Sequence, residues 1–111
     1  QVAVSYAATD REALAAAHEQ WRNVALGPMA LSDLPSPQAF DAAVADVRPE
    51  EVRRAMLVSS DPAKHARHLR EFAALGPEAI YVHNVSRQQH AFIEAYRREV
   101  IPEFAPVAPL R

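Results

Sequence analysis

Three short runs of the chain carry the hydrophobic pattern of β-strands. In QVAVSYA, at residues 1–7, the side chains of Val2, Val4 and Tyr6 recur at every second position, which is the period of a strand. MLVSS, at residues 56–60, is a short run rich in β-forming residues, and AIYVHN, at residues 79–84, is almost continuously apolar. Such continuous runs are typical of parallel strands that helices bury. The sequence therefore predicts three strands.

A helix is predicted between the second and third strands. Asp61-Pro62 supplies a side-chain acceptor for free backbone N–H groups and then a residue whose φ suits the first helical turn. Gly76-Pro77 ends the helix, because glycine takes the left-handed conformation and proline blocks continuation. One helical face is apolar and is expected to be buried: Ala66, Leu69, Phe72 and Ala73. Strand, helix and strand over residues 57–85 form a βαβ crossover.

Helices are also predicted on either side of this unit. Thr9 and Glu12 form a capping-box candidate before a helix at about residues 10–26, which Gly27 ends. Ser36-Pro37 opens a second helix, and a short turn follows at residues 48–51. A last helix starts after Ser86 and ends at Pro102, with an inner face of Phe92, Ile93, Tyr96 and Val100.

The order of these elements predicts an α/β fold with one parallel sheet. A chain of 111 residues is the size of a single domain, whereas a closed (β/α)₈ barrel needs about 250 residues. The chain is therefore at most a partial (β/α)₈ barrel over residues 1–104, made of its last three strand-helix units, with a helical insertion at about residues 28–55. Residues 105–111 form a proline-rich tail. Because the chain starts with Gln1 and enters a strand almost at once, we expect an N-terminal portion to be missing.

Composition and charge narrow the classes of partner. The net charge of −2 gives no strong field, and basic residues are scattered among acidic ones, so neither nucleic acid nor a membrane surface is an expected partner. No apolar run approaches the roughly 20 residues that span a bilayer. The chain has no cysteine, which excludes disulfides and thiolate metal sites and favours a cytoplasmic setting.

Candidate site residues follow from the rule that parallel α/β folds bind ligands at the carboxyl ends of their strands. Ser59 and Ser60 end the second strand, His83 and Asn84 end the third, and Arg87 lies at the start of the last helix. Backbone N–H groups there, together with the guanidinium, could hold a phosphate or carboxylate. The alternative is structural, with the serines as helix caps and the asparagine as a turn residue.

Histidines are the other candidates. His83 could bind a ligand or shuttle a proton, since small effects move an imidazole pKa across neutrality, or it could bond to neighbouring loop backbone. His65 and His68, three residues apart on one helix, could share a metal ion, but they are expected on an exposed helix face, as are His18 and His90. No metal site is predicted, and no residue is assigned as catalytic.

The segment from residue 57 to residue 104 resembles the C-terminal end of the luciferase-like monooxygenase family, in its branch that uses the deazaflavin coenzyme F-420. The shared pattern is VSSDP, a helix, LG, a strand, HNV, FI and a final VIP. Upstream, VSYAATDREALAAAHEQWRN and SPQAFDAAV are also similar to that family. Ser86 stands where the family often has glycine, and Pro77 where it often has an aromatic residue.

This resemblance implies a (β/α)₈ barrel oxidoreductase that passes a hydride between an organic substrate and coenzyme F-420 or FMN. The family's principal cofactor contacts lie in earlier strands, so only the region of Ser59, Ser60, His83, Asn84 and Arg87 is expected to reach the pocket. The chain is not expected to be active alone, and its partner would be the missing N-terminal barrel segment or a second copy. The alternative is a non-catalytic half-barrel that dimerises and serves as a binding or structural module.

Overall fold

A computed structural model describes residues 1–27 and 34–104 of the chain, and its centre is a three-stranded parallel sheet. The strands are β1 (Val2–Ser5), β2 (Leu57–Val58) and β3 (Val82–Asn84), in the order β2-β1-β3. In the register of the sheet, Val4 pairs with Leu57 on one side and with Asn84 on the other. The three predicted strands and their parallel direction are confirmed.

One face of the sheet is covered by α5 (Pro62–Ala73), by α6 (Gln89–Ala95) and by the turns that continue α6. These turns are the π-helical η2 (Tyr96–Val100) and the 3₁₀ turn η3 (Ile101–Glu103). Even-numbered residues of β1 point to this face, as expected from the alternation of side chains along a strand. The buried core on this side consists of Val2, Val4, Ala66, Leu69, Tyr96 and Val100.

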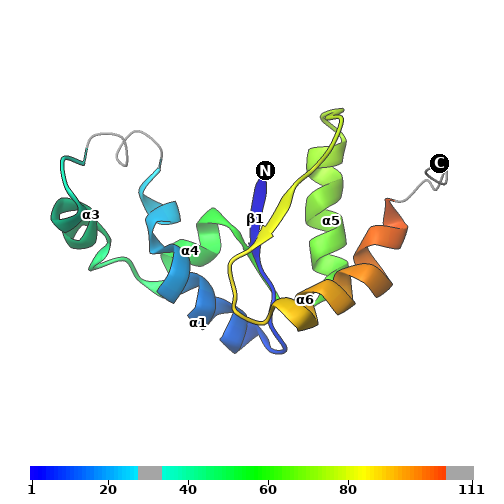
Figure 1. Ribbon diagram of the computed structural model, residues 1–111, viewed down its shortest axis with the longest axis horizontal. Coiled ribbons are helices and arrows are strands. Elements are labelled where there is room, and N and C mark those ends of the chain that lie inside the picture. Colours follow the sequence, from blue (N-terminus) through cyan, green and yellow to red (C-terminus); the bar gives the residue numbers. More distant parts are fainter. Residues whose placement is uncertain (28–33, 105–111) are drawn as a thin grey trace.

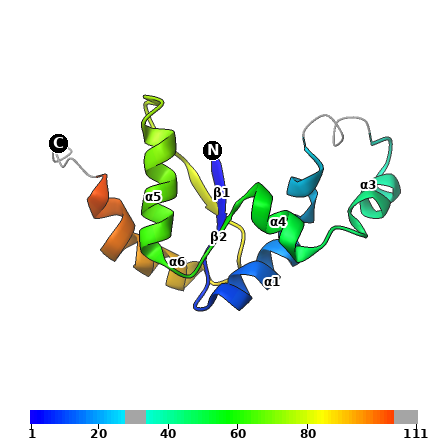
Figure 2. The same ribbon diagram turned by 180° about the vertical axis from the view of Figure 1, so that it is seen from behind.

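The other face is covered by α1 (Asp10–Trp21), its 3₁₀ continuation η1 (Arg22–Leu26) and α4 (Pro49–Ala55). A second core forms there from Ala17, Val52, Met56 and Val85, with Ala3 and Trp21 packed against it. Figures 1 and 2 show the sheet between these two helical layers, with α3 (Pro37–Val44) at the far end of the layer that holds α1. Helices therefore lie on both faces of the sheet.

This arrangement differs from the predicted run of three consecutive barrel units. In a (β/α)₈ barrel the helices form one outer ring and each strand lies next to its successor, so β2 would lie between β1 and β3. Here β1 is central, and α1 and α5 cover opposite faces. A central first strand with helices on both faces is the order found at the start of doubly wound sheets.

Helix starts and stops follow the predicted local signals. The side chains of Thr9, Ser36 and Asp61 each accept a backbone N–H in the first turn of the helix that they cap. Gly76 takes a φ of 78°, in the left-handed region that glycine favours, just after the end of α5. The helix predicted at residues 10–26 is α1 followed by η1. The predicted tail at residues 105–111 and the start of the predicted insertion, residues 28–33, lie outside the described residues.

Several burial predictions were wrong. Phe72 and Ala73, at the end of α5, and Ile93, on α6, are exposed rather than buried. His65 was expected on an exposed face, yet its side chain is completely buried. Among the helices of the described residues, none has the length and apolar character needed to span a bilayer.

Candidate functional site

A network of polar side chains joins the carboxyl ends of β1 and β3. Asn84 is buried at the end of β3, and its Oδ1 accepts the backbone N–H of Tyr6 at 2.9 Å. Its Nδ2 donates to the Ser86 hydroxyl at 3.2 Å. That hydroxyl in turn donates to the backbone carbonyl of Tyr6 at 2.6 Å. Asn84 and Ser86 therefore tie the loop after β3 to the loop after β1.

Two glutamines extend the same network. The Gln88 side chain accepts the backbone N–H of Ala8 at 2.9 Å, and Gln89 Nε2 donates to the carbonyl oxygens of Asn84 and Ser86 at 3.0 and 2.6 Å. Ser86 was predicted to cap the last helix, but its hydroxyl accepts the N–H of Gln88, one residue before α6 begins. Sequence reasoning did not identify Gln89 as part of the site.

At the carboxyl end of β2, Ser60 is hydrogen-bonded to the first residue of α1. Its backbone N–H and its hydroxyl both donate to Asp10 Oδ1, at 2.7 and 2.8 Å. These two hydrogen bonds lower the pKa of the Asp10 carboxyl, because they stabilise its charged form. The bond from the Ser60 backbone N–H has the larger effect on this pKa. Ser59 is buried, and its hydroxyl accepts the N–H of Asp61 at 2.9 Å, as a cap would.

The remaining two predicted residues lie apart from this network. The His83 ring packs edge-on against the Trp21 ring, with 5.1 Å between centroids, on the face that α1 covers. Arg87 is exposed, and its guanidinium lies 3.7 Å from the Glu19 carboxylate. Arg87 lines a hollow of about 250 Å³ between α1 and the loop after β3, together with Glu12 and Glu19. Two carboxylates beside one guanidinium do not favour an anion.

A buried chain of hydrogen bonds starts at the same end of β2 and was missed by sequence reasoning. His65 Nε2 lies 2.8 Å from the backbone carbonyl oxygen of Ser59, and His65 Nδ1 lies 2.7 Å from the Tyr96 hydroxyl. The rings of Tyr6 and Tyr96 both meet the imidazole edge-on, at centroid distances of 5.5 and 5.4 Å. His65 therefore links β2, α5 and η2 inside the core.

The partners of this imidazole set its protonation state. A carbonyl oxygen can only accept, so Nε2 carries the proton, and in the neutral ring Nδ1 then accepts the Tyr96 O–H. Burial lowers the pKa of His65, since the charged form loses its hydration, and burial raises the pKa of Tyr96 for the same reason. A neutral histidine whose Nδ1 accepts a hydrogen bond from the tyrosine hydroxyl is a structural arrangement rather than a metal ligand.

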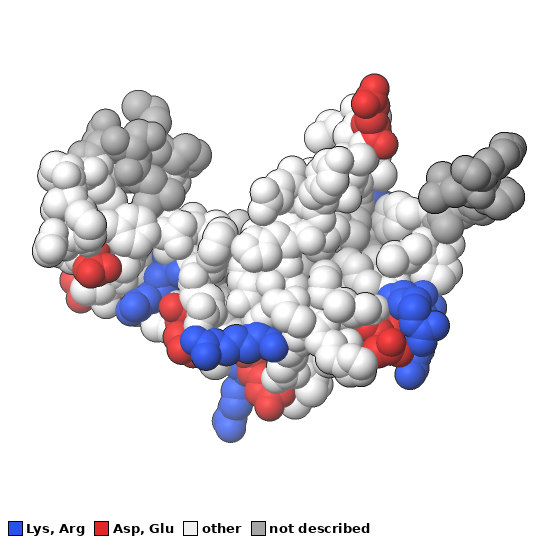
Figure 3. All heavy atoms as spheres, viewed as in Figure 1, with Lys and Arg blue, Asp and Glu red and all other residues white. Residues whose placement is uncertain are grey.

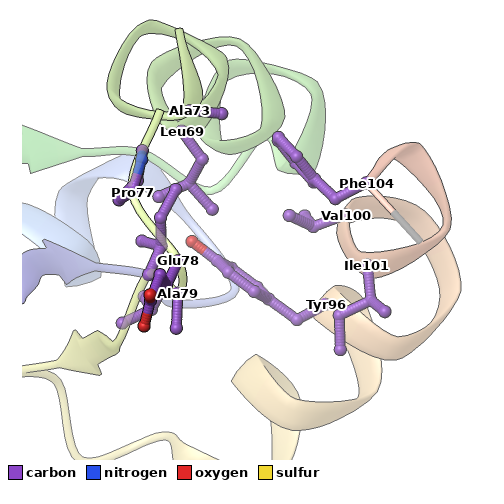
Figure 4. Close-up of a pocket in the computed structure, with 11 residues that line it drawn as sticks. Leu69, Ala73, Pro77, Glu78, Ala79, Tyr96, Val100, Ile101 and Phe104 are labelled. Atoms are coloured by element: carbon purple, nitrogen blue, oxygen red, sulfur yellow. The ribbon is translucent and has the colours of Figure 1, made fainter. Parts of the chain in front are cut away.

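An apolar groove of about 400 Å³ lies at the opposite end of β3, where that strand begins. Its walls come from α5, from residues 77–82 and from η2 and η3, as Figure 4 shows. The Tyr96 ring lies along this groove with its hydroxyl turned toward α5, where His65 receives it. Glu78 is the single charged residue in its lining. This groove is larger than the hollow beside Arg87, yet it lies away from the carboxyl ends of the strands, where the site was predicted.

The carboxyl ends of the three strands carry polar side chains of the kinds that bind ligands. These polar groups, however, are hydrogen-bonded to one another or to backbone groups. Among the described residues, no buried side-chain nitrogen or oxygen lacks a hydrogen-bond partner. No group of three or more histidine or acidic side chains in that part of the chain could hold a metal ion. Of the five predicted residues, the structure places Ser60 and Asn84 in contacts between distant segments, Ser59 in a local turn with Asp61, Arg87 at an adjacent hollow, and His83 on a helix-covered face.

Replacing Asn84 by alanine is expected to lower the free energy of unfolding by about 2 kcal/mol, because the buried N–H of Tyr6 loses its acceptor. Urea unfolding followed by circular dichroism measures this change. Arg87→Ala is the control, with an expected change below about 0.5 kcal/mol, since its ion pair is solvent-exposed. Equal effects of the two substitutions would contradict the assigned roles.

Comparison with known proteins does not add to this geometry. No family model, curated protein or solved structure matches the chain.

Proposed function

We propose that this chain is the C-terminal segment of a flavin- or F-420-dependent oxidoreductase of the luciferase-like kind, and that it forms part of the cofactor rim without being active alone. One observation carries the proposal. Polar residues that follow all three parallel strands, represented by Asp10, Ser60 and Asn84, lie at the carboxyl edge of one sheet. Parallel α/β enzymes bind their ligands at this edge.

The described residues could form only one side of such a cofactor site. A pocket for a whole ligand of this size holds about 300 to 1,000 Å³, whereas the hollow beside Arg87 holds about 250 Å³ and is flanked by two carboxylates. The remaining contacts of the cofactor would come from residues outside these 111 positions. When bound, the cofactor itself supplies the hydride chemistry. The role of this chain is to hold the loops after β1 and β3 together, through Asn84, Ser86 and Gln88.

The proposal does not depend on how the sheet continues. By resemblance, the whole protein is a (β/α)₈ barrel, in which β2 would lie between β1 and β3 rather than on the far side of β1. In a doubly wound sheet, the ligand crevice lies where the strand order reverses, between β1 and β3. Both architectures place the ligand at the carboxyl ends of the strands. We propose in addition that the protein acts in the cytoplasm and that its substrate is a small organic molecule.

The test is a titration of the full-length gene product with FMN and with coenzyme F-420, followed by fluorescence. Binding of one cofactor is expected, and Arg87→Ala is expected to weaken it several-fold, because the carboxylates of Glu12 and Glu19 in the same hollow would then face the cofactor phosphate without a cation beside them. Arg98→Ala is a matched control, because Arg98 is similarly exposed and also lies 3.7 Å from a carboxylate, but on η2. If neither cofactor binds, the proposal is wrong.

A second candidate function is a non-catalytic module that dimerises. The observation that favours it is the outer edge of β3, which has no neighbouring strand among the described residues and lies beside the apolar groove. This second function does not involve the carboxyl ends of the strands, so the two candidate functions can be tested separately.

A further inference from the structure

Tyr6 is the first residue after β1, so it lies at the carboxyl end of the central strand. In the register of the sheet, Ser5 pairs with Val58 of β2, and on the other side the N–H of Val85 donates to the Val4 carbonyl at 2.9 Å. The ends of both other strands therefore flank the end of β1. Tyr6 lies in the middle of the edge at which parallel α/β folds bind their ligands.

The backbone of Tyr6 is fixed by the loop after β3. Its N–H donates to Asn84 Oδ1 at 2.9 Å, and its carbonyl oxygen accepts the Ser86 hydroxyl at 2.6 Å. Asn84 and Ser86 are both buried. Because the N–H and the carbonyl are each bonded to a buried side chain, the direction in which the tyrosine side chain leaves the backbone is set.

The ring of Tyr6 is held as well. It meets the imidazole of His65 edge-on, with 5.5 Å between the ring centroids. That imidazole is completely buried and is itself fixed by hydrogen bonds to the Ser59 carbonyl and the Tyr96 hydroxyl. The side chain of Tyr6 is thus supported by groups that cannot move without breaking buried hydrogen bonds. A side chain that contacts a ligand needs this kind of support to be preorganised.

The Tyr6 hydroxyl, in contrast, makes no hydrogen bond to another described residue, since the bonds of Tyr6 are those of its backbone. Every buried side-chain nitrogen and oxygen in that part of the chain has a partner, so a hydroxyl without one reaches the surface. The other two tyrosines differ. The Tyr96 hydroxyl is bonded to His65, and Tyr81 precedes β3, at the opposite end of the sheet. Tyr6 is therefore the one tyrosine that offers a free hydroxyl at the carboxyl end of a strand.

The charges at this edge do not select a ligand by themselves. In the view of Figure 3, acidic and basic side chains lie side by side along the lower edge of the molecule, where the strands of Figure 1 end. Arg87 and Glu19 form one such pair, at 3.7 Å. Neighbouring charges of opposite sign leave no strong field of one sign. Individually placed polar groups must then orient a ligand, and a neutral hydroxyl is one of these groups.

We propose that the Tyr6 hydroxyl donates a hydrogen bond to an acceptor oxygen of the bound cofactor. This inference rests on the oxidoreductase function proposed above, and adds to it a residue that contacts the cofactor. Asn84, Ser86 and His65 are bonded to protein groups, so their role is to position the tyrosine. FMN and coenzyme F-420 both carry oxygen acceptors on their rings and on a phosphate group, so the inference applies to either cofactor.

Tyr6→Phe tests this inference, because it removes the hydroxyl and keeps the ring against His65. In the full-length gene product, it is expected to raise the Kd of whichever cofactor binds about five- to tenfold, the effect of one lost hydrogen bond. Tyr81→Phe is the matched control and is expected to leave Kd unchanged, since Tyr81 is 72% exposed and lies at the other end of β3. Fluorescence titration measures Kd, and urea unfolding is expected to show the same stability in both variants as in the native protein.

The possible outcomes separate this inference from the function on which it rests. Unchanged cofactor affinity in Tyr6→Phe would overturn the inference and leave the proposed function in place. A parallel loss of stability and affinity would overturn it too, because the hydroxyl would then be bonded to another part of the protein. If the native protein binds neither cofactor, the proposed function is wrong and the inference fails with it. Weaker binding at unchanged stability supports both.

Discussion

Replacing His65 by alanine is expected to lower the free energy of unfolding by about 3 kcal/mol or more. The substitution leaves two buried groups without a partner, the Ser59 carbonyl and the Tyr96 hydroxyl, and each costs about 1 to 3 kcal/mol. It also opens a cavity where the imidazole meets the rings of Tyr6 and Tyr96. Such a loss is a large share of the total stability of a domain this small.

Chemical unfolding monitored by circular dichroism measures this effect. His68→Ala is the control on the same helix, because His68 is half-buried and its ring meets the exposed ring of Phe72, so a change below about 1 kcal/mol is expected. Tyr96→Phe removes the hydroxyl alone and is expected to cost about 1 to 2 kcal/mol. This milder variant keeps the test informative if His65→Ala does not fold. Similar stabilities of His65→Ala and His68→Ala would contradict the structural role.

The same histidine makes stability depend on pH. Burial lowers the pKa of His65 in the folded chain below its ordinary value of 6.5, so between these two values the unfolded chain binds more protons. The contribution of His65 to stability is therefore fully present above the unfolded pKa. It is lost as pH falls from 6.5 toward the folded pKa, by at most about 1.4 kcal/mol per pH unit.

Unfolding free energies measured from pH 7.5 down to pH 5 test this prediction, since carboxylates remain largely ionised in that range. His65→Gln is expected to flatten the profile, because an amide can accept from Tyr96 and donate to Ser59 without titrating. His68→Gln should keep the slope of the native chain. An unchanged slope in His65→Gln would show that other groups cause the pH dependence.

Periodicity and local signals predicted most of the elements but not their order in space. Alternating or continuous apolar runs located all three strands, and Thr9, Ser36, Asp61 and Gly76 marked helix ends where the structure has them. Strand order depends on which face each connecting helix covers, and that is decided by contacts between distant segments. The barrel arrangement came from resemblance, and the described structure has β1 in the centre instead.

The sequence predicted where the candidate site lies, but it did not predict which partners the site residues contact. Ser60 and Asn84 lie at the expected edge, but their partners are Asp10 and the backbone of Tyr6, which no local pattern identifies. His65 could have been found from sequence, since it precedes the buried Leu69 by four residues and so shares its helical face. His83, by contrast, lies inside β3, where the alternation of side chains turns it toward Trp21.

The central position of β1 has a consequence for how the chain acquires its structure. β1 leaves the ribosome before both of its neighbours, and the contact between Ala8 and Gln88 spans 80 residues of sequence. Contacts that are so distant along a chain must overcome a large closure entropy before they contribute, which slows folding. The three-stranded sheet therefore assembles only after β3 has been synthesised, and until then the apolar residues of β1 are exposed to aggregation.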